Sequence, residues 1–493
     1  MNDYDYYLNK TGEFGIVEEV NYPIIVVSGL PNAKPREVVM FENGQRGQVF
    51  TLEKDKIEVL LFSKEPVRVG DKASRTDFQL TVPVGPELLG NMIDPLCNPI
   101  INTTSFKRPT LMREMDEVPL GMSMRSRIKN SLLTGVSIVD IMVPLGKGQK
   151  ELVIGDRKTG KSLFMQAMIK NQVQAGSIAI YAAIGKKRSD IKLLGDFFAK
   201  EGISNKICIV ASGSDDSPSL IYLTPYVAMT IAEYFKDSGQ DTVVVLDDLS
   251  THAKFYREIS LISRRFPGRD SYPGDIFYTH ARLLERAGNF IHPTKGEVSI
   301  SCFPVAETVE GDFTGYIATN LMGMTDGHIF FDSNVYYKGR RPAVNIFLSI
   351  TRVGRQAQDS LKRSINRELT SFLSMYDRMQ NLSHFGAELT EGVKHILSLG
   401  DKIYKLFDQG PALIIPSSIQ MIMLTLIWLN IFQDETDEVI YKYRLNMIDM
   451  YSKNEKVKKM FDSIINVDSF NNLLSSVSTK KEAILSICKT EKA

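Results

Sequence analysis

Four residues of this chain have the types and spacing of a phosphate-binding P-loop. Two glycines separated by four residues are followed directly by a lysine and a serine, in Gly155-x4-Gly160-Lys161-Ser162. The glycines allow the loop to turn its backbone N–H groups inward, toward a phosphate. Lys161 would then reach the outer phosphates, and the Ser162 hydroxyl would bind Mg²⁺. The surrounding segment 151–172 has the strand–loop–helix pattern that the motif requires, so the sequence predicts a nucleotide site here.

A pair of carboxylates follows a second apolar run. The run Thr242–Leu246 is β-branched and ends in Asp247 and Asp248. In P-loop folds, a strand next to the P-loop strand presents such an aspartate to the metal. We expect Asp247 in the Mg²⁺ shell because it directly follows the apolar run; the alternative is a strand that merely ends in a solvated turn.

The residue that should activate water is missing from its expected place. The next strand, 181–184, is followed by Gly185, Lys186, Lys187 and Arg188, with no acid among them. A lysine is a cation at pH 7 and cannot accept a proton from water. The pattern predicts a site that binds a nucleotide but is poorly equipped to cleave it.

Composition sets the protein class. The 493 residues are 43% hydrophobic and 24% charged with a formal net charge of +1, which fits a multidomain globular protein and gives no indication of nucleic-acid binding. The four cysteines are far apart, which favours reduced thiols and the cytosol. The chain start has no signal-peptide pattern, and the six histidines form no metal-ligand spacing.

The elements that must position these residues change in character along the chain. The short β-rich runs in residues 1–80 predict an N-terminal β-barrel. We expect its role to be structural, because no exposed aromatic residues cluster with Lys or Arg as nucleic-acid binding would require. Residues 81–358 alternate strands and helices, which predicts a central α/β P-loop domain with a parallel sheet. Residues 359–493 predict a C-terminal helical bundle. The expected strands are Phe14–Val20, Pro23–Val27, Val38–Phe41, Gln48–Leu52, Ile57–Phe62, Leu152–Ile154, Ile178–Ile184, Lys206–Ala211 and Thr242–Leu246.

One strongly apolar stretch, Ala412–Phe432, also contains proline, serine, glutamine and asparagine. These residues favour a buried helix over a membrane-spanning one, so we expect no direct membrane insertion.

Several longer segments resemble one protein family. They are GDRKTGKS, AAIGKKRS, VLDDLS, the run Arg264–Gly288, TDGHIFF, YYKGRRPAVN and SITRVGRQAQ, and they occur in the order found in the α subunit of F-type ATP synthase. The resemblance covers nearly the whole chain from Phe14 onward. The segment SYPGDIFYTHARLLERA is specific to the wider group of α, β, flagellar and V-type subunits. Within that group, the motifs IGKKRS, DDLS and SITRVG resemble those of α subunits.

The resemblance implies a fold, cofactors and partners. The three regions correspond to a β-barrel crown, a RecA-like nucleotide-binding domain and a helical domain. Three such chains would alternate with three β-type catalytic subunits around a γ-type central stalk. The implied cofactors are ATP or ADP and Mg²⁺, the metal being held by Ser162 and, through water, by Asp247. The implied nucleotide-binding residues are Gly155, Arg157, Lys158, Thr159, Gly160, Lys161, Ser162, Leu163, Tyr336, Arg341 and Gln409.

The resemblance also assigns a role to Arg352. It matches the family's arginine finger, which reaches the γ-phosphate in the neighbouring β-type subunit and stabilises the charge of the transition state. Without the motif, a surface ion pair would explain this arginine equally well.

Some residues depart from the family pattern. Lys186 stands where β subunits have the catalytic glutamate and typical α subunits have glutamine. Lys158 replaces the glutamine that is usual in the loop. Pro411 stands where the family typically has a glutamine that contacts the nucleotide base. These two changes weaken the expectation of adenine specificity. Gly323 replaces a serine near the catalytic interface.

Only residues 1–13 precede the first expected strand, so the family's N-terminal helix is missing and we do not expect the usual contact with a δ-type stalk subunit. This indicates an α-like paralogue from an F-type-like ATPase, in the cytoplasm or at the inner face of the cell membrane.

Two other functions would need features that the sequence does not show. A self-sufficient homohexameric motor of the flagellar or secretion type would need an acid near Lys186, and none is there. An RNA translocase similar to Rho would need a basic, aromatic barrel face.

Overall fold

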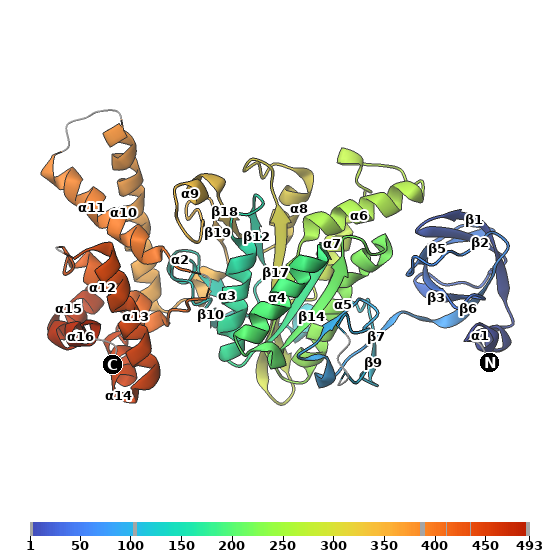
Figure 1. Cartoon of the computed structure of the whole chain (residues 1–493), viewed down its shortest axis with the longest axis horizontal. Helices are drawn as coiled ribbons and strands as arrows, with labels where there is room; N and C mark the ends of the chain where they lie inside the picture. The colour runs from blue at the N-terminus through green and yellow to red at the C-terminus, as the bar shows by residue number, and fades with distance from the viewer. Residues whose placement is uncertain (1–2, 102–105, 385–389, 411, 434, 490–493) are drawn as a thin grey trace. The chain divides into compact units, whose positions relative to one another are not determined.

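The computed structural model describes residues 3–101, 106–384, 390–410, 412–433 and 435–489 (Figure 1). The chain forms two compact units. Unit 1 comprises residues 1–126, 173–307 and 313–325, and unit 2 comprises residues 127–172, 308–312 and 326–493. The predicted boundaries after residues 80 and 358 remain a prediction, although the last barrel strand ends at Gln79 and the helical region begins at Ser360.

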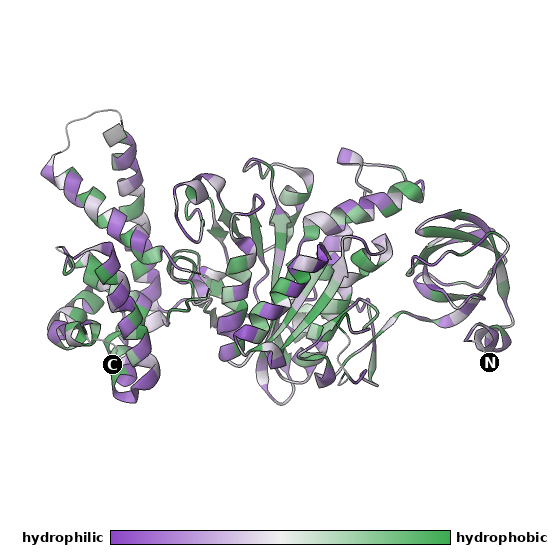
Figure 2. Cartoon of the chain, viewed as in Figure 1, coloured by the Kyte–Doolittle hydropathy of each residue, from purple (hydrophilic) through white to green (hydrophobic). Residues whose placement is uncertain are grey.

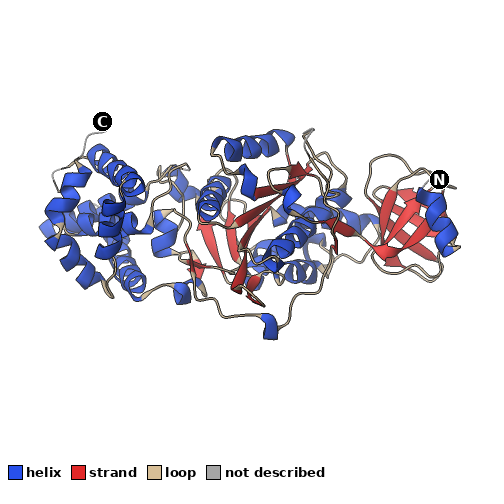
Figure 3. Ribbon diagram, turned by 90° about the horizontal axis from the view of Figure 1, so that it is seen from below, coloured by secondary structure: helices blue, strands red, loops and turns tan. Residues whose placement is uncertain are grey.

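Unit 1 begins with the predicted barrel, which is confirmed (Figure 3). Six strands close on themselves in the order β1-β2-β5-β4-β3-β6, so no strand edge remains unpaired. Buried apolar side chains such as Val27, Val39 and Phe41 fill the interior. The strands are β1 (Phe14–Asn21), β2 (Ile24–Ser28), β3 (Glu37–Phe41), β4 (Arg46–Leu52), β5 (Lys56–Leu61) and β6 (Lys72–Gln79). Four of the eight residues of β6 are buried although its sequence, KASRTDFQ, is mainly polar, so hydrophobic alternation did not reveal it.

The sequence predicted that the family's N-terminal helix is missing, but a helix of nine residues precedes the barrel. It is α1 (Asp3–Thr11), and it packs on the barrel through Tyr4, which is buried, and Tyr7, whose ring lies 5.6 Å from that of Phe78.

The rest of unit 1 contains a largely parallel sheet ordered β17-β15-β13-β14-β8, with β16 antiparallel to β17. Its inner strands are buried on both faces, which confirms the predicted α/β architecture. One expectation was wrong: β15, which carries Asp247, lies between β13 and β17, so it is not next to the P-loop strand. The strands of this sheet are β8 (Met92–Ile93), β13 (Ile178–Lys186), β14 (Ile207–Gly213), β15 (Thr242–Asp247), β16 (Gly288–His292) and β17 (Gly296–Glu307). The helices of this part are α4 (Arg188–Lys200), α5 (Pro218–Asp237), α6 (Leu249–Ile262), α7 (Ile276–Leu284) and α8 (Tyr316–Met324). A separate pair of strands is formed by β7 (Thr81–Pro83) and β9 (Met112–Glu114).

Unit 2 contains the P-loop strand. In it β12 (Glu151–Gly155) runs parallel to β18 (Gly327–Phe331), which pairs antiparallel with β19 (Ile350–Thr351). The remaining short elements of this part are β10 (Ser131–Leu132), β11 (Leu145–Gly146), α2 (Ser137–Met142), α3 (Lys161–Gln174) and α9 (Ser333–Tyr337).

The C-terminal part of unit 2 is helical, as predicted. Its most apolar helix, α12, has ten buried residues out of twelve and is mainly green in Figure 2. A helix of this length is about 18 Å long, against the roughly 30 Å of a bilayer core, so the prediction of a buried helix is confirmed. The helices are α10 (Ser360–His384), α11 (Glu391–Phe407), α12 (Ser417–Trp428), α13 (Asp437–Lys453), α14 (Glu455–Ile464), α15 (Phe470–Thr479) and α16 (Lys481–Cys488).

Within the described ranges, no helix combines the length and the apolar character needed to cross a bilayer.

Candidate functional site

The predicted P-loop joins β12 to α3 in unit 2. Gly155 ends the strand with φ of +154°, and a Cβ on it would lie 2.2 Å from the Phe331 carbonyl oxygen on β18. Gly160 has φ of +100° directly before α3 starts at Lys161. Both glycines therefore sit where a side chain would strain the backbone, and the N–H groups of the first helical turn face the loop.

Lys161 folds back over this loop. Its side chain is buried, and Nζ donates to the carbonyl oxygens of Gly155 (2.7 Å) and Asp156 (2.6 Å). The ammonium is thus held at the mouth of the loop, where a phosphate oxygen could exchange with a carbonyl as acceptor.

The other loop residues divide by exposure. Thr159 is buried, and its hydroxyl donates to the Asp156 carbonyl at 2.8 Å. The side chains available at the surface are those of Arg157, Lys158, Ser162 and Leu163.

Asp156 anchors the loop, which sequence reasoning missed. Its Oδ1 accepts hydrogen bonds from Thr308 Oγ1 (2.6 Å) and the Gly311 N–H (2.9 Å), and its Oδ2 accepts one from the Ser333 hydroxyl. Burial favours the neutral acid, but these hydrogen bonds outweigh it and lower the pKa of Asp156. The carboxylate therefore ties the P-loop to the segment 308–312 and to the start of α9. No local pattern links residues so far apart in the chain.

The end of α9 presents the predicted Tyr336 to Arg341. The Arg341 guanidinium lies 3.5 Å from the centre of the Tyr336 ring, and its Nη1 donates to the Tyr336 carbonyl at 2.7 Å. The backbone of Arg341 also pairs with the segment after α11: its N–H donates to Asp408 Oδ1 (3.2 Å), and its carbonyl accepts from the Gln409 N–H (2.7 Å). The structure thus brings together Tyr336, Arg341 and Gln409, and Ser333 connects them to the P-loop.

The Gln409 side chain is already fully hydrogen-bonded within the protein. Its Oε1 accepts from the N–H (3.1 Å) and hydroxyl (3.3 Å) of Ser137, and its Nε2 donates to the carbonyls of Gly135 (2.6 Å) and Leu413 (2.5 Å). A glutamine amide has two donors and one acceptor oxygen with two lone pairs, so no capacity is left for a base. Gln409 shapes the site through its backbone; Pro411 lies outside the described residues.

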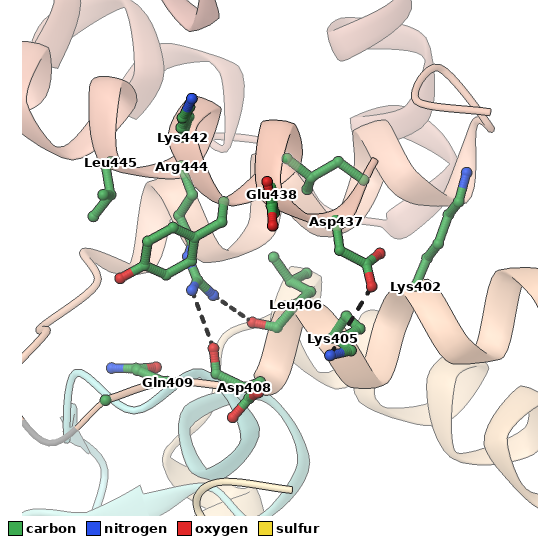
Figure 4. A pocket seen from close by; sticks show the side chains of 13 residues that line it. Lys402, Lys405, Leu406, Asp408, Gln409, Asp437, Glu438, Lys442, Arg444 and Leu445 are labelled. Carbon is green, nitrogen blue, oxygen red and sulfur yellow. Dashed lines mark hydrogen bonds and ion pairs between the residues drawn. The ribbon is translucent and has the colours of Figure 1, made fainter. Parts of the chain in front are cut away.

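A cavity of about 610 Å³ lies beside Gln409 (Figure 4). At its edge the buried Arg444 donates to the carbonyls of Leu406 (2.7 Å) and Asp408 (3.0 Å), which caps the end of α11 and fixes the segment leading to Gln409. Both charge signs line this cavity, from Lys402, Lys405 and Lys442 and from Asp437 and Glu438, so it does not select a ligand of one charge.

In unit 1, Lys186 forms ion pairs with Asp247 and Asp248. Its Nζ lies 2.7 Å from Asp247 Oδ1 and 2.9 Å from Asp248 Oδ2. Asp247 Oδ2 also accepts from the Tyr181 hydroxyl (2.6 Å), and Asp248 Oδ1 accepts from the Thr251 N–H (2.6 Å), which caps α6. Burial disfavours the ammonium, but the two carboxylates outweigh it and raise the pKa of Lys186. The residue at the expected position of the base is therefore a permanent cation.

Arg352 lies in unit 2 at the edge away from the P-loop. It follows β19, whose Thr351 pairs with Gly327, and Gly327 in turn pairs with Glu151, the first residue of β12. The P-loop leaves the other end of β12, four residues or about 13 Å along the strand. Arg352 is exposed, and its N–H donates to the Asp326 carbonyl at 3.2 Å.

Gly323, on α8, is exposed, and a Cβ there would meet nothing within 4 Å, so the position would also accept the family's serine.

The chain is similar to known proteins over most of its length. The nucleotide-binding domain of the ATP synthase alpha/beta family matches residues 135–351, and the C-terminal domain of the ATP synthase alpha/beta chain matches residues 358–480. The chain is 38% identical over 419 residues to ATP synthase subunit alpha of Orientia tsutsugamushi (strain Ikeda), covering 83% of this chain and 81% of that protein.

Two relatives from Mycoplasmopsis match over a greater length. ATP synthase subunit alpha 1 of Mycoplasmopsis pulmonis is 36% identical over 469 residues, covering 95% of this chain and 88% of the relative. ATP synthase subunit alpha of Mycoplasmopsis synoviae is 35% identical over 491 residues, covering 99% and 92%. Identity at this level over nearly the whole length, together with the barrel, the P-loop domain and the helical region, means that the chain belongs to the ATP synthase subunit alpha family.

Proposed function

We propose that this chain is the non-catalytic, nucleotide-holding α-type subunit of a rotary F-type or F-type-like ATPase. In this proposal it binds ATP or ADP at its P-loop, alternates with a β-type catalytic subunit around a γ-type stalk, and contributes Arg352 to the neighbour's site. Membership of the subunit alpha family supports the assembly, and the P-loop geometry supports the nucleotide.

The observation that carries the non-catalytic role is the state of Lys186. Hydrolysis needs a group that accepts a proton from water or orients it for attack. At the position expected for that group, an ammonium is bound by Asp247 and Asp248 at 2.7 and 2.9 Å. Either carboxylate could serve as a base only if its own ion pair with Lys186 were broken.

The position of Arg352 supports a role in a neighbouring subunit. It follows Thr351, which lies across β18 from Glu151, the first residue of β12, while the P-loop leaves the last residue of that strand, Gly155. A guanidinium placed there serves a phosphoryl group bound by another protomer better than one bound by its own loop. An arginine supplied in this way stabilises the transition state and makes turnover depend on assembly.

The two residues expected to hold Mg²⁺ differ in their fit. Ser162 is exposed in the first turn of α3, so its hydroxyl fits a metal that accompanies the phosphates. Asp247 already has a partner on each oxygen, Lys186 on one and Tyr181 on the other, so a water of the metal's shell would have to share these oxygens.

A direct test uses the isolated chain. The isolated chain should bind ATP in equilibrium dialysis and show negligible turnover, and Lys161→Ala should abolish binding. Rapid ATP hydrolysis by the pure isolated chain would overturn the proposal and favour the homohexameric motor, which no observation on the described residues supports.

The absence of a δ-type contact remains a prediction. Identification of the subunits that copurify with the native complex tests this, and a δ-type subunit bound to this chain would contradict it.

A further inference from the structure

We propose that unit 1 contains a binding site for a small tetrahedral oxyanion, of the class of inorganic phosphate and sulfate. The site is a cavity of about 200 Å³ that is lined by the barrel strand β4 and by residues of α5, α6 and α7. Pockets for larger organic ligands measure roughly 300–1,000 Å³, so this one suits a small ion. The inference does not rest on the proposed function, because the P-loop belongs to unit 2.

The first argument is the balance of charge around the cavity. Three guanidinium groups and two carboxylates line it, which leaves one net positive charge; they belong to Arg36, Arg265, Arg282, Asp116 and Asp275. Asp116 forms ion pairs with both Arg36 and Arg282, so a single carboxylate faces two guanidinium groups. An anion in the cavity would balance the remaining charge.

The second argument is that the guanidinium of Arg265 has donors in reserve. Its Nη1 lies 3.4 Å from both Asp275 Oδ2 and the Tyr256 hydroxyl. Its Nη2 lies 3.4 Å from the Phe50 carbonyl oxygen and 3.1 Å from Thr51 Oγ1. All four contacts are longer than the 2.7–2.9 Å that is typical of a hydrogen bond between ions. An oxyanion could therefore take these donors at little cost.

The third argument is that two of the arginines are fixed next to each other on the barrel. The Arg36 N–H donates to the Val49 carbonyl and the Arg36 carbonyl accepts from Gln48 Nε2, both at 3.0 Å. The guanidinium carbon of Arg265 lies 4.0 Å from the centre of the Phe50 ring, on the residue that follows Val49. Stacking of this kind orients the guanidinium plane without using its N–H donors. The two cations are thus held before any ligand binds.

The fourth argument is a neutral donor on α5. Tyr222 lines the same cavity. Burial raises the pKa of its hydroxyl, although the fields of Arg36 and Arg265 both oppose the rise. The hydroxyl therefore keeps its proton at neutral pH and can donate to an anion that lies between the two arginines.

A purely structural ion-pair network, which only joins the barrel to the helices, is the alternative. Such a network would give the cavity no affinity for an anion, so the two explanations predict different results in a binding experiment.

The experiment measures the binding of labelled inorganic phosphate to the purified full-length chain by equilibrium dialysis at constant ionic strength. All proteins carry Lys161→Ala, which removes the lysine of the P-loop and so prevents it from contributing. The test variants add Arg36→Gln or Arg265→Gln. Arg264→Gln is the matched control, because Arg264 is exposed, adjacent in the chain and not among the residues that line the cavity.

The chain with Lys161→Ala alone should bind one phosphate ion, which sulfate should displace and chloride should not. Arg36→Gln and Arg265→Gln should each weaken phosphate binding at least about tenfold, because each removes charge-assisted hydrogen bonds. Arg264→Gln should change it less than about twofold. Absence of phosphate binding would overturn the inference, and so would an equal loss of affinity in Arg264→Gln and Arg265→Gln.

A second measurement needs no variant and decides the matter if the arginine variants do not fold. Wild-type crystals soaked in selenate should show an anomalous selenium peak between Arg36 and Arg265. Selenate peaks confined to other places would overturn the inference.

The outcomes separate this site from the proposed function. A wild-type chain that binds ATP, but binds no phosphate once Lys161 is replaced, keeps the nucleotide-holding role and lacks the oxyanion site. A chain that binds phosphate after this replacement, but binds no ATP as wild type, has the oxyanion site and lacks the nucleotide-holding role.

Discussion

The ammonium of Lys186 lies 2.7 Å from Oδ1 of Asp247, on the neighbouring strand of the same sheet. In the proposed function, Lys186 stands at the position where a catalytic subunit would have its carboxylate. It also explains why a single substitution should not convert this chain into an efficient enzyme.

Lys186→Glu should create no fast ATPase site. It would place a third carboxylate against Asp247 and Asp248, which would then be buried without a cation. Loss of one partner of a buried ion pair costs about 3–5 kcal/mol, so the free energy of unfolding should fall by about that amount. Urea denaturation and an ATPase assay of the isolated chain check both parts. Lys187→Glu, at the exposed neighbour, should change the unfolding free energy by less than about 1 kcal/mol; a stable, fast Lys186→Glu enzyme would refute the interpretation.

Arg352→Ala should uncouple nucleotide binding from turnover. The side chain lies at the edge of unit 2 away from its own P-loop, so ATP affinity of the isolated chain should stay within about twofold of wild type. Turnover of the complex reassembled with the β-type subunit should fall about 10³-fold or more, because the guanidinium no longer stabilises the transferring phosphoryl group. Arg352→Lys keeps a charge but loses the planar fork, so it should recover only part of the rate. A complex with a normal rate would remove Arg352 from the neighbour's site.

The P-loop and most of the fold could be predicted because their signals are local. Glycine spacing, a following lysine and an apolar strand before them identify the loop without knowledge of distant contacts. The barrel strands β1 to β5 show short β-rich runs, whereas β6 has a largely polar sequence in a closed sheet and was missed.

The partners of the site residues could not be predicted, because sheet register and loop packing decide them. Lys186 meets Asp247 only because β13 pairs with β15 so that Ala183 lies opposite Asp247. Asp156 meets Ser333 through a fold that joins positions 177 residues apart. The family pattern placed Gln409 in the site, but only the structure shows its side chain occupied by Gly135, Ser137 and Leu413.

Asp156→Ala should loosen the P-loop without touching the phosphate-binding groups. It removes an acceptor from Thr308, Ser333 and the Gly311 N–H, and hydrogen bonds to a charged group are each worth about 1.5–3 kcal/mol. ATP affinity, measured by calorimetry, should fall about tenfold or more, and the melting temperature should fall with it. Thr308→Val removes a single one of these bonds and should show a smaller loss; equal affinities for wild type and Asp156→Ala would contradict the anchoring role.

The buried pair His252 and His280 should make stability depend on pH. His252 Nε2 lies 3.1 Å from the Tyr222 carbonyl, so it must donate there, and its Nδ1, 3.0 Å from His280 Nε2, must then accept. Burial lowers the pKa of His252 to about 4 and the pKa of His280 well below its ordinary value, so both rings are neutral in the fold.

The sign of the effect follows from the direction of these shifts. An unfolded histidine titrates near pH 6.5, so the stabilisation is complete above that pH and is lost as the pH falls toward about 4. One such group loses about 1.4 kcal/mol per pH unit, or about 3 kcal/mol over this interval. Urea denaturation between pH 7.5 and pH 4.5 should show a falling unfolding free energy, and His280→Phe should reduce the slope. His292→Asn, outside the pair, should leave the slope unchanged; a slope equal in wild type and His280→Phe would show that other groups govern the acid sensitivity.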